Sequence, residues 1–214
     1  MDDSYFGFDG ARMSLARHGY FEARAIIGRI LSPRRRRARK PLLQIGAGSN
    51  LLPEFENLDF YLANGGQTGH VAHDVRRPLP YADATFEGVY SEHTLEHLYP
   101  GEAMRLLAEI RRVLKPGGIF RCSVPDLGKY VEFYEGRSQI EQFGRFRSGC
   151  EALWNLTQNH LHRSVWDADM LERQMIAQGF ASAKRRGFRE GADERLLVDI
   201  EHRAWESLYM EGVR

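Results

Sequence analysis

The 214-residue chain contains only two cysteines, Cys122 and Cys150, so a disulfide framework is excluded. It also lacks a long apolar run and a signal peptide, and we therefore expect a cytoplasmic protein. The formal net charge is only +1, so we expect no broad basic face and no nucleic-acid partner. The length suits one domain with a full core but is too short for two independent domains.

A Gly-x-Gly turn follows an apolar segment early in the chain. Residues 41–45 read as a strand buried on both faces, because apolar residues run through them without polar alternation. Gly46 and Gly48 then allow a sharp turn and a close approach of the backbone to a bound molecule. A dinucleotide site would have a third glycine where this chain has Leu51, which disfavours that class of ligand.

Strand patterns alternate with helical patterns along most of the chain. The clearest helix is expected at 101–114, where Lys115-Pro116-Gly117-Gly118 ends it, and another at 167–178. This alternation predicts an α/β fold with a doubly wound parallel sheet. The expected strands are 41–45, 57–61, 70–74, 85–90, 119–124, 180–188 and 206–214.

Two segments fall outside the alternation. Residues 1–40 predict a helical extension that ends in a basic linker, and the aromatic-rich residues 130–166 predict an irregular insertion after the fifth strand. The apolar face of the extension is expected to pack over a ligand site or against the sheet. The alternative is a weak contact of residues 20–40 with a membrane surface.

Polar residues end nearly every expected strand. In an open α/β sheet, ligands bind outside the carboxyl ends of the strands, so these residues are candidates for one site. Asp59 follows Gly46 by only thirteen positions, and Pro53 lies between them, so a helix between the first two strands must be short or distorted. The candidates are Gly46, Asp59, Asp74, Ser91, Glu92, His93 and Asp126.

Several phrases of the sequence resemble the class I S-adenosylmethionine-dependent methyltransferases, and among them the methyltransferase type 11 branch. The resemblance is strong over 41–134 and fainter elsewhere. It implies a Rossmann-like methyltransferase domain over 41–214, a mostly parallel seven-stranded sheet closed by an antiparallel pair, and an enzyme that uses S-adenosyl-L-methionine. The phrases are Ile45-Gly46-Ala47-Gly48, Glu92-His93-Thr94-Leu95-Glu96-His97, Arg112-Val113-Leu114-Lys115-Pro116-Gly117-Gly118 and Val124-Pro125-Asp126-Leu127.

The resemblance also suggests roles in holding the cofactor. The backbone of Gly46, Ala47 and Gly48 would pass the amino-acid end of the cofactor, and Asp59 would accept hydrogen bonds from both ribose hydroxyls. Asp74 would accept from the adenine amino group with Val75 nearby. Two further residues expected at the cofactor are Ser91 and Glu92.

His93 is the expected catalytic residue, a general base that would face the transferred methyl group. The alternative is that Glu92 and His93 only cap a helix that begins near Thr94. Spacing of four residues would let His93 and His97 share a metal, but the H-E-x-x-H pattern is absent, so no metal is expected. The expected acceptor contacts are Asp126, His160 and His162.

The preferred function is methyl transfer to a small or medium acceptor, such as a hydroxyl or amine of a sugar or another metabolite. The alternative is a non-catalytic binding or scaffold domain, suggested by the short segment after Gly48. A third class, nucleic-acid modification, draws on the basic run at 34–40 and the aromatic insertion, and the near-neutral charge opposes it. The oligomeric state is left open.

Overall fold

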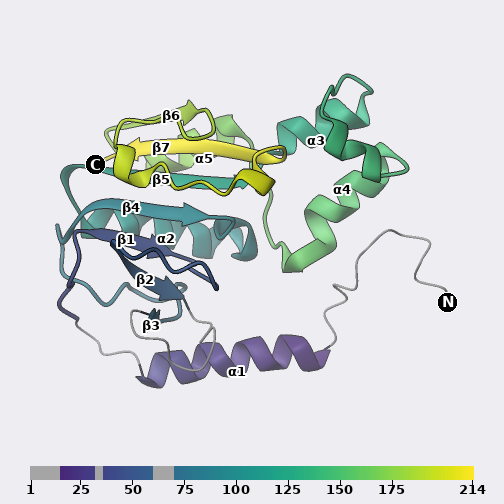
Figure 1. Ribbon diagram of the computed structural model, residues 1–214. Helices are drawn as coiled ribbons and strands as arrows, with labels where there is room; N and C mark the ends of the chain where they lie inside the picture. The colour runs from purple at the N-terminus through teal and green to yellow at the C-terminus, as the bar shows by residue number, and fades with distance from the viewer. Residues whose placement is uncertain (1–14, 32–35, 60–69) are drawn as a thin grey trace.

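A computed structural model describes residues 15–31, 36–59 and 70–214. In these residues seven strands form one sheet, in the order β3-β2-β1-β4-β5-β7-β6 (Figure 1). The pairs from β3 to β5 are parallel, and β7 runs antiparallel to both β5 and β6. The predicted α/β sheet, mostly parallel and closed by an antiparallel pair, is confirmed. The strands are β1 (Leu42–Ile45), β2 (Phe55–Asp59), β3 (His70–Ala72), β4 (Phe86–Glu92), β5 (Leu114–Pro125), β6 (Ser182–Arg186) and β7 (Ser207–Val213).

Strand β1 lies at the point where the strand order reverses, since it pairs with both β2 and β4. All four of its residues are buried, as expected for a strand covered on both faces. Residues 46–54 join β1 to β2 without a helix, which fits the expectation of a shortened connection. Gly46, at a φ of +75°, packs so closely on Thr94 that a Cβ there would lie 1.9 Å from Thr94 Oγ1.

One face of the sheet is covered by α2 (Pro100–Val113) and α5 (Ala168–Ala177). Helix α2 starts with Pro100 in its first turn, where a missing N–H costs nothing, and Glu102 Oε2 accepts from the Tyr99 N–H at 3.0 Å. It ends where Leu114 passes straight into β5. The apolar stripe of α2 buries Leu106, Leu107 and Ile110 in the main core, each contributing about 1.5–3 kcal/mol.

The opposite face is covered by residues 187–206, which include the 3₁₀ helices η6 (Glu194–Leu196) and η7 (Glu201–Arg203). Leu196 packs there against Leu42, Phe55 and Tyr90 in a smaller core. The Ile200 N–H of this segment donates to Glu92 near the carboxyl edge of the sheet, and Ser207, the first residue of β7, contacts His93.

Arg121 on β5 is fully buried and fastens this segment to the sheet. Its Nε and Nη2 donate to the two carboxylate oxygens of Asp199 at 2.9 and 2.6 Å. The remaining N–H groups reach the carbonyl oxygens of Gly187 and Glu190 and the carboxylate of Glu211. All five guanidinium N–H groups thus have acceptors, which offsets the cost of burying the charge.

The insertion is a small helical lobe and not the irregular segment that its sequence suggests. It consists of α3 (Leu127–Tyr134), η4 (Glu141–Arg145), α4 (Gly149–Gln158) and η5 (Asn159–Leu161). The aromatic residues form a second core in which Tyr130 and Phe143 are fully buried and make an edge contact. Figure 1 shows α3 and α4 beyond the carboxyl end of β5, beside the strand ends that bear the candidate residues.

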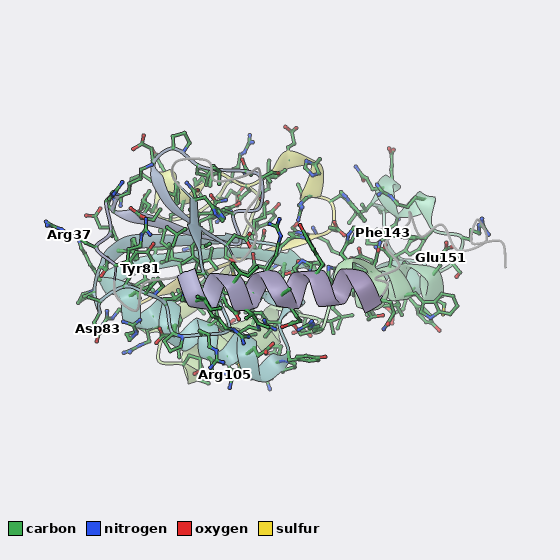
Figure 2. All side chains as sticks on the ribbon, turned by 90° about the horizontal axis from the view of Figure 1, so that it is seen from below. Arg37, Tyr81, Asp83, Arg105, Phe143 and Glu151 are labelled. Atoms are coloured by element: carbon green, nitrogen blue, oxygen red, sulfur yellow. The ribbon has the colours of Figure 1, made fainter. Side chains whose placement is uncertain are left out.

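Helix α1 (Leu15–Leu31) lies along the β3 side of the molecule and extends toward the lobe that contains Phe143 (Figures 1 and 2). Ion pairs hold it, from Arg29 to Asp74 at 2.7 Å and from Glu22 to Arg76 at 2.8 Å. Ile30 on the helix is 77% exposed. None of the helices described has the length and apolar character that a membrane span requires. Residues 1–14 and 32–35 of the expected extension lie outside the described residues.

We expect Arg121→Met to lower the free energy of unfolding by about 3–5 kcal/mol, because Asp199 would be left buried without its partner. The matched control is Arg195→Met. Arg195 pairs with Glu87 and Asp193 at 2.8 Å but is half exposed, so its loss should cost at most about 1 kcal/mol. Urea unfolding followed by circular dichroism measures both. Equal, small losses would contradict the role given to Arg121.

We expect Gly46→Ala to cost about 1–3 kcal/mol more than Gly48→Ala, because the new methyl group would overlap Thr94. Both glycines have a positive φ, but no heavy atom of the other described residues, apart from the two chain neighbours, lies within 4 Å of a Cβ built on Gly48. When Thr94 is also changed to alanine, Gly46→Ala should lower the free energy of unfolding by less than it does in the parent. Urea unfolding of the four variants tests this, and equal costs for the two glycine changes would show that Thr94 does not restrict Gly46.

Candidate functional site

The Gly-x-Gly turn and Asp59 are brought together at the carboxyl ends of β1 and β2. The N–H groups of Gly46 and Ala47 both donate to the Leu58 carbonyl, and the Gly48 N–H donates to Asp59 Oδ2 at 2.8 Å. The left-handed φ of Gly48, +52°, lets its N–H reach the carboxylate. The space above Gly48 is open in the described part of the chain, so a ligand can approach the turn there.

Asp74 follows β3 and is almost fully buried, in contact with two arginines. Its Oδ1 accepts from the backbone N–H and Nε of Arg76, and its Oδ2 accepts from Arg29 Nε and Arg76 Nη2. These bonds hold the pKa of Asp74 below its ordinary value, although burial acts in the opposite direction. Four donors fill the four lone-pair positions of a carboxylate, so an adenine amino group could bind Asp74 only if an arginine moved.

The other residues expected near the cofactor are buried in the sheet or next to it. Ser91 sits in β4 opposite Ile45, and its hydroxyl has no hydrogen-bond partner in the described part of the chain. Glu92 Oε1 accepts the Ile200 N–H at 3.0 Å, and burial raises the pKa of this carboxyl. Val75 packs in the main core beside Asp74.

His93 ends β4 with a φ of +45° and turns its ring inward. The Ser207 hydroxyl donates to the Arg203 carbonyl at 2.8 Å, so it must accept from His93 Nε2, which lies 2.8 Å away. Burial, followed by the charge of Arg203, holds the pKa of His93 well below its ordinary value, so the ring is neutral. The lone pair is therefore on Nδ1, which lies 3.4 Å from Glu96 Oε1.

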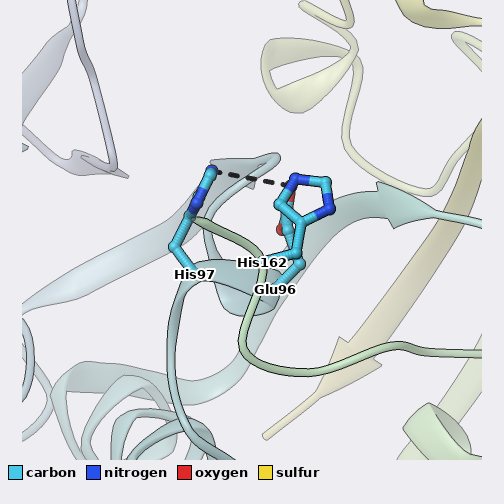
Figure 3. Close-up of side chains that lie close together, drawn as sticks. All are labelled: Glu96, His97 and His162. Carbon is cyan, nitrogen blue, oxygen red and sulfur yellow. Dashed lines mark ion pairs between the residues drawn. The ribbon is translucent and has the colours of Figure 1, made fainter. Parts of the chain in front are cut away.

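Glu96 forms the centre of a cluster that the sequence did not identify. Its carboxylate is 2% exposed, and neither oxygen has a hydrogen-bond partner among the residues that the structure describes. Burial raises the pKa of Glu96 to about 8. One atom each of Glu96, His97 and His162 lies within 4.8 Å of the other two (Figure 3). The structure thus groups His97 with Glu96 and His162, whereas the sequence suggested considering it with His93.

The lobe supplies the two remaining histidines. His162 Nδ1 is 2.6 Å from the Leu156 carbonyl, and the rings of His97 and His162 meet edge to face with centroids 5.1 Å apart. His160 has a φ of +53°, and its ring lies 6.0 Å from that of His162. Burial and the neighbouring histidines lower the pKa of His97 and of His162.

Asp126 has structural partners on both carboxylate oxygens. It caps α3 by accepting from the Gly128 N–H at 2.9 Å, and its other oxygen accepts from Arg185 Nη2 at 3.0 Å. Burial, the largest influence, raises its pKa in spite of these donors. The expected acceptor contact is therefore a helix cap in this conformation of the chain.

The sequence overlooked three residues that shape the site: Thr94, Glu96 and Ser207. A signal for Glu96 was present, because Glu-His occurs at 92–93 and again at 96–97, one helical turn apart. Thr94 joins the two halves of the site, since its side chain packs on Gly46 while its backbone follows His93. Ser207 lies 114 residues from His93, and no local pattern connects the two.

Comparison with known proteins agrees with this geometry. The type 11 family described as "Methyltransferase domain" matches residues 53–122. The probable methyltransferase ltbC of Aspergillus luteorubrus is 34% identical over 114 residues, which cover 51% of this chain and 34% of that protein. The chain thus spans about a third of the length of this curated relative.

Solved structures share the fold. An S-adenosylmethionine-dependent methyltransferase from Thermotoga maritima superposes with a TM-score of 0.53 at 14% identity, covering 90% of this chain and 88% of that one. Another from Archaeoglobus fulgidus gives a TM-score of 0.52 at 16% identity, covering 90% and 93%. Together with the strand order, these matches show the fold of the class I S-adenosylmethionine-dependent methyltransferases, and residues 53–122 match the methyltransferase domain family.

Proposed function

We propose that the chain transfers the methyl group of S-adenosylmethionine to a hydroxyl or amine of a small or medium acceptor, such as a sugar or another metabolite. The observation that carries the proposal is the position of Thr94. Its side chain packs on Gly46 in the turn beside Asp59, and the residue directly before it in the chain is His93. The glycine turn and the histidine cluster are therefore two sides of one site.

The residues of the turn suit the cofactor. The open space over Gly48 admits the amino-acid end, and the backbone groups of Gly46 and Ala47 border it. Asp59, at the end of β2, already orders the turn by accepting from Gly48, and we assign it the ribose hydroxyls. The bound cofactor supplies a methyl group on a positively charged sulfur, which leaves as a neutral thioether.

The acceptor side requires placement and, for a hydroxyl, removal of a proton. We assign proton removal to His93. Ser207 fixes its tautomer by accepting from Nε2, so the basic lone pair on Nδ1 faces the interior of the cluster. His160 and His162, from the lobe over the strand ends, are assigned to contact the acceptor.

The cellular location belongs to the same proposal. Both cysteines are free: Cys122 is buried and Cys150 is exposed. Unpaired thiols are typical of a reducing compartment, which supports the cytoplasm.

A non-catalytic binding domain is the second candidate. It is favoured by one observation, the absence of a helix from residues 46–54 between β1 and β2. Isothermal titration with S-adenosylhomocysteine separates the two. Micromolar or tighter binding supports the enzyme, whereas no measurable heat with folded protein favours the scaffold role.

Asp59→Asn should weaken S-adenosylhomocysteine binding by about 1–3 kcal/mol, because an amide cannot accept from both ribose hydroxyls and still hold the Gly48 N–H. Asp169→Asn is the control, since Asp169 lies on α5 with 70% of its side chain exposed. Titration calorimetry gives both dissociation constants. If the Asp59 variant binds S-adenosylhomocysteine as tightly as the parent, the ribose hydroxyls bind to another residue.

His93→Asn should lower turnover about 10²- to 10⁴-fold and leave the dissociation constant of S-adenosylhomocysteine nearly unchanged. Asparagine tolerates the positive φ at this position, so the backbone should persist. The exposed His202 provides the control His202→Asn. Turnover is followed as S-adenosylhomocysteine release with an acceptor that the parent methylates, and undiminished turnover would reduce His93 to a structural role.

A further inference from the structure

The Glu96 carboxylate is buried without the hydrogen bonds that a buried polar group normally makes. Within the described residues, both oxygens are buried without a hydrogen-bond partner, and imidazole nitrogens of His93 and His97 lie 3.4 and 4.0 Å from Oε1. Native structures rarely leave a buried polar group unsatisfied, and an ion or water is the usual explanation. A buried carboxyl group beside imidazole nitrogens offers the kinds of ligand atom that a cation can use.

His162 is prepared to act as a ligand. Its Nδ1 lies 2.6 Å from the Leu156 carbonyl, which can only accept, so the proton is on Nδ1 and the lone pair is on Nε2. This is the arrangement that orients metal-binding histidines, in which one ring nitrogen donates to a carbonyl and the other faces the ion. The Leu156 carbonyl alone orients the His162 ring, so no carboxylate is required for that purpose.

His97 completes the group from the other side. It follows Glu96 directly in the 3₁₀ helix η3 (Leu95–His97), and Figure 3 shows its ring opposite Glu96 and His162. The ligand atoms of the three residues lie within 4.8 Å of one another, so small rotations would bring them to the 2.0–2.2 Å bonds of zinc.

We propose that Glu96, His97 and His162 bind one divalent transition-metal ion, with Zn²⁺ as the preferred ion. Two imidazoles and one carboxylate are ligands that suit zinc and its neighbours in the first transition row, whereas Mg²⁺ and Ca²⁺ require oxygen ligands. Three protein ligands leave a coordination position open, as in catalytic zinc sites. This position belongs to the acceptor side of the site, next to His93.

The proposal goes beyond methyl transfer, and direct metal binding tests it. The full chain, free of any affinity tag and stripped with a chelator, is titrated with Zn²⁺ in a calorimeter, and Co²⁺ is added separately to follow its visible absorption. We expect one Zn²⁺ per chain, and no competition from Mg²⁺ at the same concentration. Glu96→Gln, His97→Gln and His162→Gln should each weaken Zn²⁺ binding at least tenfold, whereas the exposed His202→Gln should leave it unchanged.

Circular dichroism and S-adenosylhomocysteine titration on the same samples separate the outcomes. Lack of stoichiometric Zn²⁺ binding by the folded parent would overturn the proposal, and so would parent-like affinity in all three ligand variants. If the parent binds S-adenosylhomocysteine but no Zn²⁺, the metal site fails and the proposed function stands. If the parent binds Zn²⁺ but no S-adenosylhomocysteine, the metal site stands and the proposed function fails.

Discussion

The buried pair of Arg121 and Asp199 determines the position of the segment that leads to the His93 contact. It holds residues 187–206 against one face of the sheet. From the same segment, the Ile200 N–H reaches Glu92, and the chain then enters β7 at Ser207, which fixes the ring of His93. A charge pair in the middle of the sheet therefore orients a histidine at its edge, through one continuous piece of backbone.

The parts of the fold that the sequence predicted are those with a local cause. Strand β1 and helix α2 follow from apolar runs and helical spacing, and the meeting of Gly48 with Asp59 follows because parallel strands end at the same edge. The lobe was less predictable. Its aromatic residues are irregular in sequence because they pack on one another from several short helices, so no single period describes them.

The partners of the site residues were beyond prediction because they come from distant segments. Asp74 and Asp126 stand at strand ends as expected. Arg76 and Gly128, each two residues away, bind them locally, but the arginines 45 and 59 residues away that complete their carboxylate contacts were not predicted. The burial of Glu96 could not be predicted either, because it too depends on a distant segment. Its sequence pattern matches that of an exposed helical turn, and only the packing of the lobe over η3 makes it a buried carboxylate.

The contact between α1 and Asp74 has a thermodynamic consequence. Arg29 occupies the carboxylate that the family resemblance offers to adenine, so a docked helix and an adenine amino group there would exclude each other. Linkage then requires reciprocity, because each occupant weakens the other by the same factor. The ion pairs that hold α1 are partly exposed, so added salt would loosen the helix and shift that competition toward the ligand.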